Sequence, residues 1–114
     1  MKHNALEMTL LLDYYGELLT EKQKTCFDLY YNQDLSLGEI AEEAGISRQG
    51  VHDSLARAEA TLVDMEAKLG CMARAARLQQ TLQTICKAAQ DLQKIPQAKD
   101  LADTILAAAM DLKE

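Results

Sequence analysis

The chain has 114 residues and a mass of 12.6 kDa, about one domain's worth, which leaves no room for a large enzyme core with a second module. Alanine and leucine contribute 17 and 18 residues, whereas valine and isoleucine contribute only 2 and 5. Because alanine and leucine favour helices and β-branched residues favour strands, this composition predicts an all-α fold and argues against an all-β or α/β one.

The net charge of −6 is unevenly distributed. Residues 1–70 hold six basic and thirteen acidic side chains, and residues 71–114 hold six and five. Sequence-independent DNA binding depends on Lys and Arg that neutralise phosphates, so the acidic first half weighs against it.

The chain has the features of a cytoplasmic protein. Its longest wholly apolar stretch, residues 105–110, is far shorter than the roughly 20 residues of a membrane span. We recognise no signal peptide. Cys26, Cys71 and Cys86 form no CxxC pair and are typical of reduced thiols, so we expect a cytoplasmic location and no membrane span.

Two helices are predicted before residue 33. Apolar residues at helical spacing predict the first, from about 4 to 18: Met8, Leu11, Leu12, Tyr15, Leu18 and Leu19. Thr20 and Gln23 form a capping box that opens the second, which runs to about Asn32 and buries Phe27 with Tyr30 or Tyr31.

The segment from Ser36 to Leu55 predicts a helix-turn-helix. Ser36 and Glu39 form a second capping box for a short helix over Leu37–Ala44. Gly45 supplies the left-handed turn, and Ser47 caps the next helix. The wedge between the two helices is small or apolar: Ile40, Ala41, Ile46, Val51 and Leu55. This is the arrangement in which the second helix offers its first residues to a DNA major groove.

The chain beyond Ser47 carries a long apolar seam with a possible interruption at Gly70. The seam has heptad spacing and includes Leu55, Leu62, Leu69, Leu78, Leu82 and Leu92. At Gly70 a stutter, a bend and a true break all fit the pattern. Pro96 ends the helix, and a final helix carries Leu101, Ile105, Ala108 and Leu112. We expect a winged-helix-like, three- to four-helix DNA/RNA-binding domain over 1–69, and a helical dimerisation region over 70–114 that makes a homodimer.

Five side chains are the candidate nucleic-acid contacts. Arg48, Gln49 and His52 lie at the start of the recognition helix, where Arg reads guanine and Gln reads adenine. Ser47 and the first backbone amides suit a phosphate, and Arg57 lies within reach of another. In the alternative interpretation, Ser47 is only a cap, Arg48 and Gln49 are solvated, and the motif binds protein.

No catalytic or metal-binding pattern is present. His3 and His52 lie far apart in sequence, and neither has a second ligand at metal-binding spacing. There is no glycine-rich phosphate loop and no nucleophile elbow. We expect no cofactor, no metal and no enzymatic activity.

The segments 19–23, 29–31, 35–43 and 47–53, above all S-L-G-E-I-A-E-E and S-R-Q, resemble the YlxM family of small bacterial helix-turn-helix proteins. The same stretch is distantly similar to the sigma-factor region that reads the −35 promoter element. The resemblance implies an all-helical, often dimeric cytoplasmic protein of the signal recognition particle pathway. Gly50 and His52 depart from the family pattern, which more often has alanine and an aromatic residue there.

Two functions follow from this resemblance. The first is a dimeric helix-turn-helix regulator that binds DNA or the particle's RNA. The second is a protein-binding adaptor that docks on the particle's GTPase or its RNA, without sequence-specific DNA binding. The acidic first half favours the adaptor, and the intact caps and turn favour the regulator.

Overall fold

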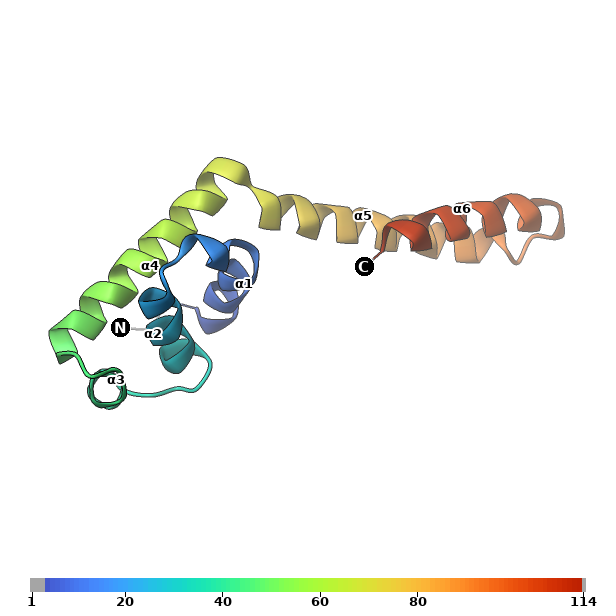
Figure 1. Cartoon of the computed structure of the whole chain (residues 1–114). Helices are drawn as coiled ribbons and strands as arrows, with labels where there is room; N and C mark the ends of the chain where they lie inside the picture. The colour runs from blue at the N-terminus through green and yellow to red at the C-terminus, as the bar shows by residue number, and fades with distance from the viewer. Residues whose placement is uncertain (1–3, 114) are drawn as a thin grey trace. The chain divides into compact units, whose positions relative to one another are not determined.

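A computed structural model of the chain describes residues 4–113, and these residues form helices and no strand. The elements, in chain order, are α1 (Ala5–Tyr15), η1 (Gly16–Leu18), α2 (Glu21–Tyr31), α3 (Leu37–Ala44), α4 (Arg48–Leu69), α5 (Cys71–Leu92), η2 (Pro96–Ala98) and α6 (Lys99–Leu112) (Figure 1). The predicted all-α class is therefore confirmed. The chain divides into two compact units, Met1–Met72 and Ala73–Glu114.

The first unit packs its helices around one apolar core, and α4 lies along α1 and α2 (Figure 1). The side chains that are completely or almost completely buried include Leu11, Phe27, Ile40, Val51 and Leu62. The rings of Phe27 and Tyr31 also pack together, with their centroids 4.6 Å apart and their planes tilted by 38°. Tyr31 is the buried member of the tyrosine pair, while Tyr30 is only half-buried.

The predicted helix starts and the predicted turn are confirmed. Both capping boxes are complete, with the Thr20 and Ser36 side chains accepting from the amides of Gln23 and Glu39. Gly45 has a φ of 70°, in the left-handed region that glycine adopts without steric cost. Ile40, Val51 and Leu55 are buried between α3 and α4, as the wedge requires.

Gly70 breaks the long helix. It has a φ of 64°, so α4 ends at Leu69 and α5 begins at Cys71. Three apolar residues of the seam, Leu55, Ala58 and Leu62, are buried in the core of the first unit. That part of the heptad pattern therefore serves the core of the first unit.

The second unit is an antiparallel hairpin in which α5 and α6 lie side by side (Figure 1). Its apolar contact consists of Leu82, Cys86, Leu106 and Ala109. The turn is fixed by Asp103, which accepts hydrogen bonds from Gln93 Nε2 at 2.6 Å and from Lys99 Nζ at 2.7 Å. The predicted stripe of the last helix lies on the exposed side, because Ala102, Leu106 and Ala109 form its inner face.

The cysteines are free thiols, with Cys26 and Cys86 buried and Cys71 half-buried. Among residues 4–113, no helix combines the length and the apolar character that crossing a bilayer requires.

Candidate nucleic-acid interface

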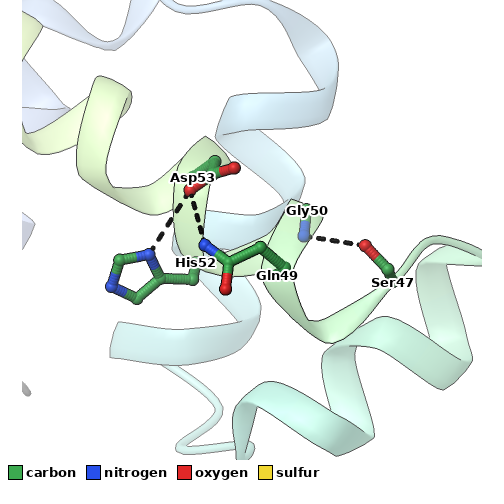
Figure 2. A network of polar contacts seen from close by, with 5 residues as sticks. All are labelled: Ser47, Gln49, Gly50, His52 and Asp53. Carbon is green, nitrogen blue, oxygen red and sulfur yellow. Dashed lines mark hydrogen bonds and ion pairs between the residues drawn. The ribbon is translucent and has the colours of Figure 1, made fainter.

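The first turn of α4 lies open to solvent directly after the turn at Gly45. Ser47, Arg48 and Gln49 are all exposed. The Ser47 hydroxyl accepts a hydrogen bond from the amide of Gly50 at 2.9 Å and so caps the helix (Figure 2). The backbone of Gly50 lies close to this cap, because an added Cβ would lie 3.1 Å from Ser47 Oγ.

Asp53 organises the side chains one turn further along. Gln49 Nε2 donates to Asp53 Oδ1 at 3.0 Å, and His52 Nδ1 lies 3.5 Å from the same oxygen (Figure 2). The hydrogen bond from Gln49, followed by that from His52, lowers the pKa of the Asp53 carboxyl. The exposed surface of α4 thus holds an ionised carboxylate that occupies one donor of Gln49.

Positive charge lies on both sides of this carboxylate. Arg48 precedes it and forms no ion pair within the described part of the chain. Arg57 follows it one turn later and lines a groove of about 340 Å³ with Lys22 from the start of α2. Lys24 does not line this groove, and its Nζ lies 3.8 Å from Glu17 Oε1.

The acidic side chains of α3 are also exposed. Glu42 and Glu43 are solvated, and Glu39 completes the helix cap by accepting from the Ser36 amide at 3.0 Å. The hydrogen bonds from the backbone and side chain of Ser36 lower the pKa of Glu39. Negative charge therefore borders the open end of α4 from the preceding helix.

The five candidate residues lie on more than one side of α4: His52 lines a pocket with Tyr30, whereas Arg57 lines the groove with Lys22. Ser47, Arg48, Gln49 and His52 lie in the first turns of α4, and Arg57 lies on the edge that faces α2. Sequence reasoning missed the part played by Asp53, although the spacing from Gln49 to Asp53 is that of neighbours on a helix. It also missed Ser54, which is buried with an unpartnered hydroxyl.

Two helices joined by a left-handed glycine, with the front of the second uncovered, define a helix-turn-helix protein. Residues 2–102 match the model of the UPF0122 family, described as "Putative helix-turn-helix protein, YlxM / p13 like". The chain belongs to this family.

Relatives in the family include proteins that align with the chain from end to end. A UPF0122 protein of Thermoanaerobacter sp. (strain X514) is 41% identical over 114 residues, which cover 100% of this chain and 97% of the relative. One from Clostridium novyi is 40% identical over 102 residues, 90% of this chain and 89% of the relative. One from Desulforamulus reducens is 56% identical over 68 residues, 60% of this chain and 58% of that relative's length.

Proposed function

We propose that this protein is a dimeric, cytoplasmic helix-turn-helix regulator that binds nucleic acid, either DNA or the RNA of the signal recognition particle. Its contact surface is Ser47, Arg48, Gln49, His52 and Arg57. Residues 1–69 form the binding domain, and residues 70–114 form the dimerisation region.

The exposure of the first turn of α4 carries this proposal. Arg48 and Gln49 are uncovered, and Gly45 sets the turn that presents them. A helix of this kind enters the major groove with its N-terminal residues at the base edges. There an Arg pairs with guanine O6 and N7, and a Gln pairs with adenine N6 and N7. To pair with a base, the Gln49 side chain gives up its hydrogen bond to Asp53 and bonds the base edge instead.

The small core of the second unit supports dimerisation. The hairpin buries few side chains, among them Leu82, Cys86, Ala89 and Ala109. Its exposed apolar residues include Leu78, Ile85, Leu92, Leu101 and Ile105. Units of about 40 residues usually need oligomerisation, disulfides or metals to be stable. A second hairpin packed on these residues supplies the missing core.

Membership of the family supports a role in the signal recognition particle pathway, because the YlxM resemblance implies it. A second candidate function is an adaptor that docks on the particle's GTPase. The observation that favours it is the charge around α4, where Asp53 lies beside Gln49 and exposed Glu42 and Glu43 lie on the preceding helix. These carboxylates repel phosphates and suit a basic protein surface.

The test is a set of titrations of the purified protein with the particle's RNA, a random duplex and the purified GTPase, each at several salt concentrations. Arg48→Ala is compared with Lys68→Ala, which removes an equal charge from the far end of α4, where Lys68 pairs with Asp64 at 2.9 Å. The regulator predicts that Arg48→Ala weakens nucleic-acid binding and that Lys68→Ala leaves it unchanged.

Equal effects of the two substitutions would contradict the assigned surface. Micromolar binding to the GTPase that survives Arg48→Ala, without binding to either nucleic acid, would favour the adaptor. Salt dependence separates the two further, since each neutralised phosphate adds about 0.9 to the slope of log K against log salt.

A further inference from the structure

A groove beside α4 is lined by two basic side chains and by several hydrogen-bond donors. It lies between the start of α2 and the edge of α4, with a volume of about 340 Å³, and is lined by Thr20, Lys22, Gln23, Gly50, Asp53, Ser54 and Arg57. It is separate from the cap of α4, because Ser47 is not among the lining residues.

The N-terminus of α2 contributes free backbone donors. Thr20 caps the amide of Gln23 at 3.1 Å, and the Gln23 side chain caps the amide of Thr20 at 3.0 Å. The amides of Glu21 and Lys22 are left without a hydrogen-bond partner in the described part of the chain, as expected for the first two positions of a helix. These donors and the helix dipole favour an anion.

Ser54 supplies an independent sign that the groove takes a ligand. The residue is only 9% exposed, and its buried hydroxyl has no hydrogen-bond partner. A serine inside a helix ordinarily bonds the carbonyl four residues back or points to solvent. A buried hydroxyl without a partner costs stability, and Ser54 is among the residues that line the groove, where an acceptor oxygen would satisfy it.

The charges in the groove favour an anion over a cation. Lys22 and Arg57 line it, and neither forms an ion pair within the described residues. The opposing charge is Asp53, whose Oδ1 already accepts from Gln49 and faces His52. Ammonium, guanidinium, hydroxyl and free amides are all donors, and a phosphate group has only acceptor oxygens to offer at neutral pH.

We propose that this groove binds a phosphate group of a nucleic-acid backbone, with Lys22, Ser54 and Arg57 as side-chain donors and the first amides of α2 as backbone donors. The proposal rests on the proposed function and deepens it. With α4 in a major groove, its Arg57 edge lies toward one bordering strand, and the phosphate site anchors that strand. Phosphate contacts of this kind fix orientation and carry no base specificity.

The chain offers a matched control for this site. Lys22→Gln removes a charge that lines the groove, whereas Lys24→Gln removes one on the same helix that faces Glu17. Ser54→Ala removes the orphan hydroxyl without changing charge. A random 20-base-pair duplex is titrated over a range of salt concentrations. Inorganic phosphate is followed separately, by amide shifts against chloride at equal ionic strength.

Lys22→Gln is expected to weaken duplex binding and to lower the salt slope by about 1, while Lys24→Gln leaves both unchanged. Ser54→Ala is expected to raise the midpoint of thermal unfolding and to weaken duplex binding by about tenfold. A structural role for Ser54 alone would change stability and leave binding intact. Equal behaviour of the two lysine variants, or unchanged binding by Ser54→Ala, overturns the site.

The two proposals fail separately. Duplex binding that depends on Arg48 but not on Lys22 or Ser54 overturns the phosphate site and leaves the proposed function in place. If no duplex binds, inorganic phosphate that shifts the amides of Glu21 and Lys22, and loses this effect in Ser54→Ala, supports the anion site and overturns its assignment to a nucleic-acid backbone. Absence of a phosphate effect together with normal duplex binding by Ser54→Ala overturns the site.

Discussion

Tyr15 of α1 donates a hydrogen bond to Glu66 of α4, with 2.6 Å between the hydroxyl and Oε1. The same hydroxyl accepts from the amide of Cys71 at 3.1 Å, and Glu66 Oε1 accepts from the amide of Met72 at 3.0 Å. Tyr15 and Glu66 therefore cap the start of α5 immediately after the break at Gly70. The first helix of the chain is thus hydrogen-bonded to residues more than 50 positions away in the sequence.

Tyr15→Phe is expected to lower the midpoint of thermal unfolding by several degrees, because it removes the two hydrogen bonds that the phenol makes with the Glu66 carboxylate and the Cys71 amide. Burial, followed by the bond to Glu66, raises the pKa of Tyr15 from 10.0 to about 12. The folded state thus holds the phenol proton more tightly. The advantage of wild type over Tyr15→Phe is complete below pH 10 and is lost as the pH rises toward 12.

Denaturant unfolding of both proteins across this pH range measures the difference. Tyr14→Phe is the control, since Tyr14 is the neighbouring residue and is 48% exposed. A constant difference between wild type and Tyr15→Phe from pH 9 to about pH 12 would contradict the assigned role of the phenol proton.

Gly45→Ala is expected to destabilise the first unit by about 1 kcal/mol, because alanine is strained at a φ of +70°. No atom lies within 4 Å of the added Cβ, so the whole effect comes from the backbone. Gly38→Ala is the matched control in α3, where the nearest atom is Ser36 Oγ at 3.9 Å and the backbone is helical. It is expected to stabilise by a few tenths of a kcal/mol or more. Chemical denaturation measures both, and equal effects would argue against the strained turn.

Local signals made the first unit predictable. The capping boxes at Thr20 and Ser36 and the turn at Gly45 depend on side chains within three residues of each other, so they can be recognised in one sequence. The wedge of Ile40, Val51 and Leu55 follows from helical spacing alone. These same features placed Arg48 and Gln49 on an exposed turn.

Long-range contacts were beyond the sequence. No local sequence pattern predicts that Tyr15 bonds Glu66, so the capping of α5 could not be anticipated. The same holds for the groove beside α4, which Lys22 and Ser54 line from two different helices. The backbone conformation of Gly70 could not be predicted either, because a glycine within a heptad seam can be helical or left-handed. The sequence also does not decide which face of α6 packs against α5. The larger residues Leu101 and Ile105 lie on the face that the hairpin leaves exposed.

Ile85→Asp combined with Ile105→Asp is expected to convert the proposed dimer to a monomer. Each side chain is 39% exposed in the hairpin, and a charge there is compatible with the isolated chain but not with a dry interface. Analytical ultracentrifugation at several concentrations measures the mass. Leu6→Asp, at a position 71% exposed in α1, is the control for an apolar surface residue in the first unit. A double variant that stays dimeric, or a wild type that is monomeric at micromolar concentration, contradicts dimerisation through the hairpin.

Asp53→Asn is expected to strengthen binding to a random duplex several-fold at low salt, because it removes a carboxylate from the proposed contact surface and releases the side-chain donor of Gln49. The gain shrinks as salt rises, since the repulsion is screened. Because hydrogen bonds from Gln49 and His52 lower the pKa of Asp53 below 3.8, the carboxylate stays ionised from about pH 5 upward. Asp53→Asn therefore removes a full negative charge at any pH from about 5 upward.

Asp64→Asn is the matched control, since it removes an equal charge from the same helix at a position paired with Lys68. Fluorescence anisotropy with a labelled duplex at several salt concentrations measures all three proteins. If Asp53→Asn and Asp64→Asn gain equally, the effect is one of net charge, and the surface around Gln49 does not face the nucleic acid. If Asp53→Asn instead binds more weakly, the carboxylate makes a favourable contact, as it does when it accepts a hydrogen bond from cytosine N4.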